Sequence, residues 1–439
     1  MPSYADRIRR LLSDPEQLEQ LYRQAVKKGE TEAFAAAIHS LRAEMPDNLL
    51  LAAWHYRLAA EETPTRRGRL RSHWLWAILL SIPCGLVFWW LSGDYYVYER
   101  GWLPWLIFIW APISAGFILV FLALAGQHRS RRLAIMMAGL AFVSAYAYFA
   151  TRLIDSVVFR RQYVNLGAIH LILMAWAAVG FYVLTGQGDH ESRFAFFIKS
   201  LEAVVMGGLF GAVVSIFSSI SMGLFGALGI DLPDLLTRLF LAGGMGLIPV
   251  LAVAMVYDPL LAMREQNFRA GLSSFIATLL RIFVPLAIIV LLVYVGFIPF
   301  RFTAPFYERE MLVIYNVMLF AVIALLLGVT PVLPEVLSET SRRWLRRGEM
   351  LLALLAEIVS LHALAAIIFR TWWDGFTPNR VTVIGWNLVN IGLLGVLLYR
   401  QWKAGESRWL AETHRTFAQA AWPYLGLGLA LLLGLPLVF

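Results

Sequence analysis

Residues 282–300 read IFVPLAIIVLLVYVGFIPF. No charged side chain interrupts this stretch. As an α-helix it would be about 29 Å long at ~1.5 Å per residue, close to the ~30 Å thickness of the hydrocarbon layer of a bilayer. The stretch therefore predicts a helix that crosses a membrane.

Further stretches of similar length and character lie on both sides of this one. They are residues 74–91, 103–125, 133–150, 165–185, 201–221, 238–256, 311–332, 350–369, 381–399 and 418–439. The stretch that begins at residue 201 stays apolar through Ile230, so a break near Ser218 to Gly223 would divide a segment too long for one straight span. We therefore predict an all-α, polytopic transmembrane helix bundle with about 11 spans, within a range of 10 to 12.

The composition agrees with a membrane protein. Hydrophobic residues make up 59% of the 439 residues, charged residues make up 15%, and the mean hydropathy is +0.67. Soluble proteins carry about 25% charged residues, and one water-soluble core could not bury so much apolar surface. A soluble enzyme and a disordered chain are excluded, and the single cysteine, Cys84, excludes a disulfide scaffold. The net charge of +8 is spread over short loops, so we expect no nucleic-acid partner.

Residues 1–63 differ from the rest of the chain. They contain 8 Lys or Arg and 10 Asp or Glu residues, with apolar residues at helical spacing. Asp14 followed by Pro15 is typical of a helix start. We predict a cytosolic domain of about four short helices in residues 1–63, a basic linker in residues 64–73 and a transmembrane domain in residues 74–439. The cytosolic helices offer a surface for a cytosolic or membrane protein partner.

The basic residues predict an orientation in the membrane. Loops on the N-terminal side of the bilayer contain 20 of the 37 Lys and Arg residues, and the opposite loops contain 9. Lys and Arg concentrate in the cytoplasmic loops of membrane proteins. We therefore expect the N-terminus in the cytosol and, after eleven spans, the C-terminus outside.

One run of sequence carries a family resemblance. The run RIFVPL at residues 281–286 continues through Tyr294 to a short loop and a further span from Met311. This arrangement resembles a stretch in a family of uncharacterised bacterial polytopic membrane proteins, known only as a domain of unknown function. The resemblance implies a multi-pass protein of the bacterial cytoplasmic (inner) membrane. It implies no substrate, cofactor or catalytic residue.

The common catalytic motifs are missing from the sequence. It contains no Walker loop, no H-E-x-x-H, no nucleophile elbow and no C-x-x-C. Asp189, His190 and Glu191 are adjacent, and adjacent residues rarely converge on one metal ion, so we interpret them as a solvated loop. We expect no catalytic residue, no cofactor and no metal site, and we favour a role other than catalysis.

A membrane enzyme stays as a third hypothesis, because it would need clustered charges at one membrane face. The best set for this role is Arg152, Asp155, Arg160, Arg161 and Tyr163. An interfacial amphipathic helix explains the same residues.

Polar residues inside the spans mark the candidate site. Glu357 and His362 lie well within the stretch at 350–369, whereas Glu202 and Arg281 fall at helix ends, where snorkelling explains them.

The next span supplies polar partners. Asn387 and Asn390 share a helix face, and counting from the helix ends places Glu357 level with Asn390 and His362 with Asn387. The four residues form either a proton-coupled or substrate-binding patch, or a structural contact that joins two helices.

Small residues form a second pattern, in Gly207, Gly208 and Gly211 of one span and Gly243, Gly244 and Gly246 of the next. Close helix packing is the interpretation that we favour, and a broken helix pair beside a cavity is the alternative.

Two functions from different classes fit these observations. The first is a transporter or permease-like protein in the lipid bilayer, with a small-molecule or ion substrate that the sequence does not identify. The second is a membrane scaffold, assembly or sensor protein whose N-terminal helices bind a cytosolic partner. A cavity at Glu357 would favour the first, and a filled bundle would favour the second.

Overall fold

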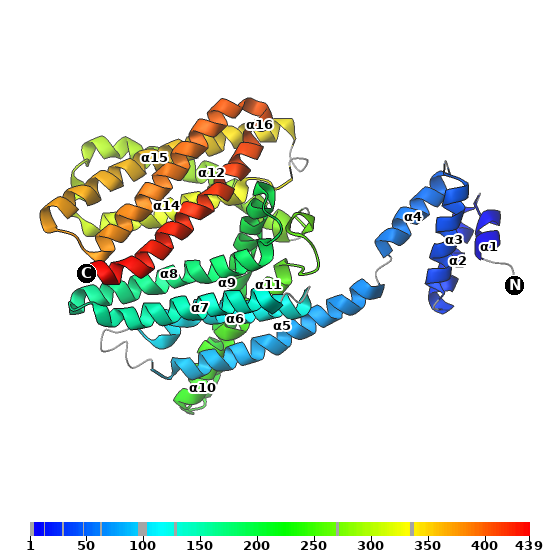
Figure 1. The fold of residues 1–439 in the computed structure, drawn as a ribbon, viewed down its shortest axis with the longest axis horizontal. Helices are drawn as coiled ribbons and strands as arrows, with labels where there is room; N and C mark the ends of the chain where they lie inside the picture. Colours follow the sequence, from blue (N-terminus) through cyan, green and yellow to red (C-terminus); the bar gives the residue numbers. More distant parts are fainter. Residues whose placement is uncertain are drawn as a thin grey trace. The chain divides into compact units, whose positions relative to one another are not determined.

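A computed structural model gives the structure of this chain (Figure 1). It describes residues 4–12, 14–28, 30–46, 48–61, 64–94, 103–126, 130–268, 272–333 and 338–439. These residues form helices and loops, with no strand among them, which confirms the all-α prediction. The chain divides into two compact units, Met1–Trp74 and Leu75–Phe439.

The first unit is built from short helices with local caps. Its described residues form α1 (Tyr4–Arg10), α2 (Pro15–Lys28), α3 (Thr31–Glu44), α4 (Leu49–Glu61) and the first turns of α5 (Pro64–Leu91). The Asp14 carboxylate accepts the N–H of Gln17 at 3.1 Å, as expected for an N-cap ahead of Pro15. The Asn48 side chain accepts the N–H of Leu51 at 3.1 Å and begins α4 in the same way.

This unit has a hydrophobic core of its own. The rings of Tyr22, Phe34 and Trp54 lie with centroids 5.2 to 5.6 Å apart, in tilted and edge-to-face pairs. Aliphatic side chains such as Leu18 and Ile38 are fully buried around them. The helical spacing of apolar residues in the sequence produces this core, because residues three and four apart share one helix face.

The second unit is a bundle of long helices. After the continuation of α5 come α6 (Trp105–Ala125), α7 (Ser130–Ala150), α8 (Val157–Leu184), α9 (His190–Ala227), α10 (Asp234–Arg238), α11 (Gly244–Val256), α12 (Leu272–Phe297), α13 (Ala304–Tyr307), α14 (Arg309–Val329), α15 (Glu339–Asp374) and α16 (Pro378–Val438). Within the described part of the chain, 10 helices are long and apolar enough to cross a membrane. A polytopic helical bundle is therefore confirmed.

Helix α16 accounts for the difference between ten helices and eleven predicted spans. It is 61 residues long and kinks at Gly405, whose φ of 66° lies in the left-handed region. Arg400 donates a hydrogen bond to the side chain of Gln419 at 2.7 Å, and Tyr424 donates to Asn390. These contacts join the two halves as an antiparallel hairpin, drawn in orange and red in Figure 1. Residues 381–399 and 418–439 therefore occupy separate halves of α16.

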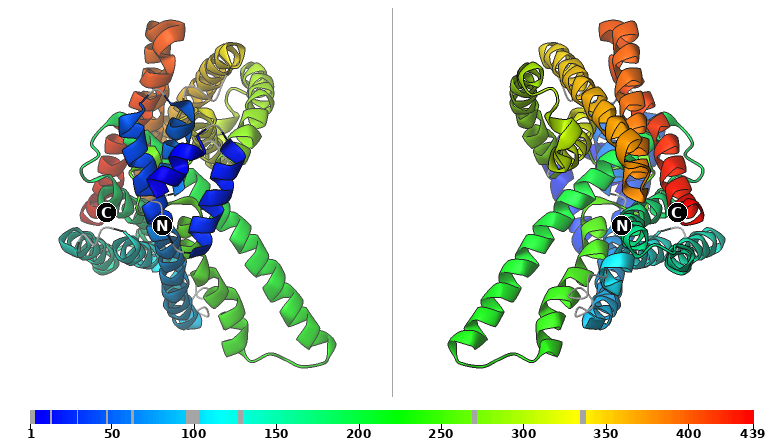
Figure 2. Two further views of the ribbon diagram at one scale, coloured as in Figure 1. Left: turned by 90° about the vertical axis from the view of Figure 1, so that its right-hand side faces the viewer. Right: turned by 90° about the vertical axis from the view of Figure 1, so that its left-hand side faces the viewer.

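Helix α9 does not break where the sequence suggested a break. It is continuous over 38 residues, about 57 Å at ~1.5 Å per residue, and passes through the region from Ser218 to Gly223. The chain turns back only at Gly229, where φ is 72°. Ser218 donates to the carbonyl oxygen of Phe240 at 3.0 Å, inside a short π-helix at Leu239–Gly243. Figure 2 shows the resulting hairpin in green, extending beyond the other helices of this unit.

Two hydrophobic clusters hold the second unit together, and α9 contributes to both. Phe194 belongs to a cluster made by α9, α12, α14, α15 and α16. Phe196, two residues later, belongs to a cluster made mainly by α5, α6, α8 and α11. Side chains two apart on a helix diverge by about 200°, so one helix can serve two neighbouring cores.

At Gly244 and Gly246 of α11, short distances to neighbouring helices confirm the interpretation of the glycines as sites of close helix packing. A Cβ at Gly246 would lie 2.8 Å from the Cα of Gly85 in α5, and a Cβ at Gly244 would lie 2.7 Å from a methyl group of Val214. Gly207 and Gly208 differ, because a Cβ would find contacts of 3.8 Å or longer at Gly207 and none within 4 Å at Gly208. The close approach of α5 and α11 therefore depends on Gly246.

We expect Gly246→Ala to lower the free energy of unfolding by about 1–3 kcal/mol, because its methyl group meets backbone that cannot move aside. Gly208→Ala is the matched control, since its methyl group meets open space and should stabilise the helix slightly. Thermal unfolding of both variants in detergent measures the difference. Equal stability of the two variants would contradict the packing described here.

Candidate functional site

The two predicted asparagines of α16 are buried and paired with other elements. The Asn387 amide donates to the side-chain oxygen of Asn316 in α14 at 2.9 Å, and to the carbonyl oxygen of Val383 at 2.8 Å. Asn390 accepts a hydrogen bond from Tyr424 in the second half of α16. Asn387 therefore joins α16 to α14, and Asn390 joins the two halves of α16.

The two predicted residues of α15 lie elsewhere. The Nε2 atom of His362 is 2.9 Å from the carbonyl oxygen of Phe302, and its ring stacks on the Phe302 ring. The Glu357 carboxylate is half-buried beside Gly395, where a Cβ would lie 3.8 Å from its Oε1. Among the described residues no hydrogen bond joins Glu357 to Asn387 or Asn390. The four residues therefore share no hydrogen bond with one another among the described residues, and their role as one polar site stays a prediction.

The sequence did not indicate a buried carboxylate in the first half of α15. Glu349 is 1% exposed and accepts hydrogen bonds from Thr330 at 3.2 Å and from Gln401 at 3.1 Å. Gln401 also donates to Thr413 at 3.0 Å. Residues from three chain segments meet here, so no spacing in the sequence could predict the network. Glu349 directly precedes the predicted span 350–369, outside the stretch in which the sequence analysis sought polar residues.

Polar residues around the start of α8 are engaged in local structure. Arg160 donates twice to the carbonyl oxygen of Ile154, at 3.0 and 2.7 Å, and Ser156 caps α8. The hydroxyl of Tyr163 is buried and donates to the carbonyl oxygen of Leu432 at 2.9 Å. These contacts hold the start of α8 and favour the structural interpretation of this segment.

A large apolar cavity lies between α5, α6, α8, α9 and α11. Its volume is about 1140 Å³, somewhat above the ~300–1,000 Å³ of typical ligand pockets. The lining includes residues of α11 and the preceding turn from Leu241 to Tyr257, a backbone rise of roughly 24 Å at ~1.5 Å per residue. The cavity is therefore long as well as wide, and its length approaches the ~30 Å hydrocarbon thickness of a bilayer.

Several apolar side chains that line the cavity are exposed. Val204 of α9 is 71% exposed, Trp110 of α6 is 38% exposed and Ile172 of α8 is 40% exposed, and all three line the cavity. The wall of the cavity therefore includes apolar side chains that the protein itself does not cover.

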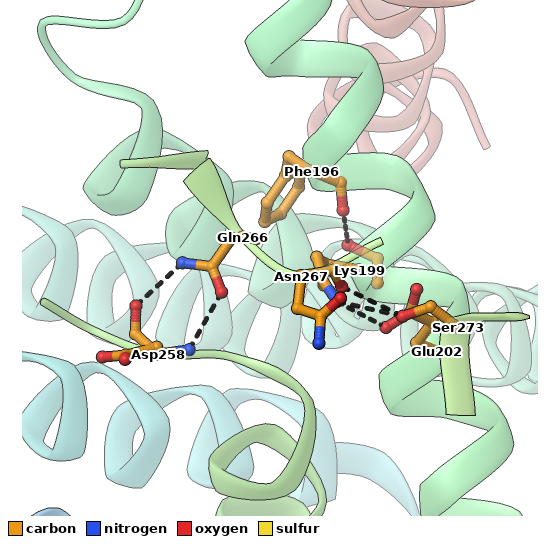
Figure 3. Close-up of polar contacts among 8 residues, drawn as sticks. Phe196, Lys199, Glu202, Asp258, Gln266, Asn267 and Ser273 are labelled. Carbon is orange, nitrogen blue, oxygen red and sulfur yellow. Dashed lines mark hydrogen bonds and ion pairs between the residues drawn. The ribbon is translucent and has the colours of Figure 1, made fainter. Parts of the chain in front are cut away.

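One end of the cavity is closed by a buried ion pair, shown in Figure 3. Lys199 lines the cavity, and its ammonium group donates to Glu202 at 2.8 Å, to the carbonyl oxygen of Asn267 at 2.7 Å and to Ser273 at 3.3 Å. The side chains of Lys199 and Glu202 are 6% and 3% exposed. Snorkelling therefore does not explain Glu202, because its carboxylate pairs inside the protein.

Residues 257–268 form a loop beneath this end. Gln266 folds the loop by accepting the N–H of Asp258 at 3.0 Å and donating to its carbonyl oxygen at 2.8 Å (Figure 3). Met263 is 1% exposed and lines the cavity, and its N–H donates to Gln187 at 3.0 Å. The loop thus packs against the Lys199 end of the cavity.

Asp189 anchors the loop from the start of α9. Its carboxylate caps α9 through Ser192 and accepts from Arg264 at 2.6 Å, while Glu191 lies 3.0 Å from the same guanidinium. Partial burial raises the pKa of Asp189, but the hydrogen bonds from Ser192 and Arg264 outweigh it and lower the pKa to about 2. Asp189 and Glu191 therefore anchor the loop through Arg264, and no group of three metal-ligating side chains occurs among the described residues.

The other end of the cavity carries Arg238. Its Nε donates to Asp234 at 2.8 Å, and both residues line the cavity. The Arg238 side chain is 25% exposed and that of Asp234 is 82% exposed. Polar groups are sparse between the two ends, where the Oγ of Ser114 is buried without a hydrogen-bond partner in the described structure.

The chain matches no family model, none of the curated proteins and no solved structure. The fold and the cavity therefore carry the functional argument by themselves.

The contact between Asn316 and Asn387 should show energetic coupling. We expect the double variant Asn316→Ala/Asn387→Ala to be destabilised by about 1 kcal/mol less than the sum of the single variants, since one interhelical hydrogen bond is lost only once. Asn165 is exposed on α8, so Asn165→Ala combined with Asn387→Ala should be additive. Unfolding in mixed micelles measures the three single and two double variants, and an additive Asn316/Asn387 pair would contradict the contact.

The anchor at Asp189 should depend on pH. Its pKa is lowered by folding, so its stabilising effect is complete above its usual value of 3.8 and is lost as the pH falls through about 2. We expect cleavage within residues 257–268 by pepsin to increase from pH 4 to pH 2 more in the wild-type protein than in Asp189→Asn, whose Arg264 contact is already weakened. Mass spectrometry of the fragments measures this, and identical pH profiles would count against the anchor.

Proposed function

We propose that this protein is an integral membrane protein that binds a lipid-like amphiphile in the cavity between α5, α6, α8, α9 and α11. It then moves the amphiphile between the two ends of that cavity, as a permease does. The observation that carries the proposal is the long apolar cavity with charged residues only at its ends. Such a lining suits an acyl chain, because an acyl chain leaves no buried polar group without a hydrogen-bond partner.

The same lining argues against a hydrophilic substrate. Sites for ions and polar solutes in membrane transporters use ionisable side chains or unwound backbone near the middle of the bilayer. Here the middle of the cavity offers Ser114 and otherwise apolar side chains such as Ile248 and Ala252. An amphiphile fits better, because only its head group requires polar partners.

The cavity, and not the hairpin of α15 and α16, is the proposed substrate site. It is lined by none of the four residues that the sequence indicated, Glu357, His362, Asn387 and Asn390. The hydrogen bonds of Asn387 and Asn390 support a structural role, in which polar side chains join helices inside the lipid. The Oε2 atom of Glu357 is buried without a hydrogen-bond partner among the described residues, so a binding role for Glu357 stays a prediction from the sequence.

The orientation follows from the charges of the loops. We propose that the protein lies in the bacterial cytoplasmic membrane with the first unit in the cytosol, because the basic loops fall on that side. The Lys199 end of the cavity then faces the cytosol and the Arg238 end faces outward.

A side chain that fills the cavity should block binding. Gly207 lines the cavity, whereas the neighbouring Gly208 does not and has open space around it. We expect Gly207→Phe to reduce photocrosslinking to a lipid with a diazirine in its acyl chain, and its movement between leaflets of liposomes, by about tenfold, or ~1.4 kcal/mol of binding.

Gly208→Phe is the matched control and should retain both activities, because its ring faces away from the cavity. Both variants must first show wild-type thermal unfolding. Equal crosslinking of the two variants would overturn the proposed site, and crosslinking without movement between leaflets would reduce the function to binding.

A further inference from the structure

The two ends of the cavity differ in what they offer to an anionic head group. A lysine ammonium group has three N–H donors. Those of Lys199 are directed at Glu202, the carbonyl oxygen of Asn267 and Ser273. A phosphate at this end would have to displace a buried carboxylate that is 3% exposed. The Lys199 end is therefore already satisfied.

Among the described residues, Arg238 uses only some of its hydrogen-bond donors. A guanidinium group has five N–H donors, and Arg238 uses its Nε toward Asp234. Within the described residues neither of its Nη atoms has a hydrogen-bond partner. The edge formed by the two Nη atoms matches a pair of phosphate or carboxylate oxygens. Among the described residues, the Nη edge of Arg238 is thus unoccupied beside an apolar cavity.

The absence of a side chain at Gly93 makes room for the guanidinium of Arg238. A Cβ at Gly93 would lie 3.0 Å from Nη1, so a larger residue there would crowd the guanidinium. Ser92 and Thr237 also line this end and supply hydroxyl groups. Asp234 shares the end, but its carboxylate is 82% exposed, so water screens its hold on Arg238.

We propose that the amphiphile carries a phosphate in its head group, that Arg238 binds this phosphate through its Nη atoms, and that Asp234 competes for the same guanidinium. The inference rests on the proposed function and names its substrate class. The volume of about 1140 Å³ favours a phospholipid over a fatty acid, because one acyl chain would leave much of the cavity unfilled.

Binding to the full-length protein in detergent tests the inference. The probes are phosphatidic acid, phosphatidylethanolamine, a fatty acid and diacylglycerol, the last with the same chains and no phosphate. The measured quantity is the Kd for diacylglycerol divided by the Kd for phosphatidic acid. We expect Arg238→Gln to lower this ratio about tenfold, the effect of losing one charge-assisted contact, and Asp234→Asn to raise it.

Arg161→Gln is the matched control, because it removes an exposed arginine of α8 that does not line the cavity. A similar fall of the ratio in this variant would show attraction by overall charge and overturn the inference. A ratio that Arg238→Gln leaves at the wild-type value, or a fatty acid that binds more tightly than phosphatidic acid, would also overturn it. Preference for phosphatidylethanolamine over diacylglycerol would extend it to zwitterionic phospholipids.

The failure of this inference and that of the proposed function are distinguishable. Suppose that Gly207→Phe weakens the binding of every probe while Arg238→Gln leaves the ratio of the two Kd values unchanged. The cavity is then the binding site, but the assignment of a phosphate head group to Arg238 is wrong. If Gly207→Phe binds all probes as the wild-type protein does, the cavity is not the binding site and both proposals fall.

Discussion

The hydrocarbon layer offers no hydrogen-bond partners, and this constraint explains most of the second unit. Backbone polar groups are satisfied within helices, and side-chain hydroxyls bond back to them, as Ser360 does to the carbonyl oxygen of Ala356 at 2.6 Å. Asn387 finds Asn316 in another helix for the same reason. A polar residue inside a span is thus first a structural element, and only an unpartnered one needs another explanation.

The cavity results from uneven packing of the helices around it. Gly246 brings α11 close to α5, while Gly207 leaves room between α9 and α11. The clusters around Phe194 and Phe196 hold α9 along the first part of its length, and its remaining turns diverge as a hairpin (Figure 2). One long helix that belongs to two cores therefore separates them enough to leave an apolar space.

The first unit has a hydrophobic core that is separate from those of the second unit. Its core around Phe34 and Trp54 is complete within the unit, so its helices need no partner to bury their apolar faces. Exposed Leu49 and Tyr56 lie on α4, at 86% and 66% exposure. A cytosolic or membrane protein partner for residues 1–63 stays a prediction from the sequence.

The sequence by itself determined the helical class, the approximate positions of the spans and the cap at Asp14. Length, hydropathy and capping are properties of contiguous residues, so a single chain displays them directly. Only the tertiary structure decided that Glu357 lies beside Gly395, that Glu202 is paired with Lys199 and that the cavity runs toward Arg238. These features join helices far apart in the chain, and helix packing, set by the shapes of small and large side chains, has no local signature in the sequence.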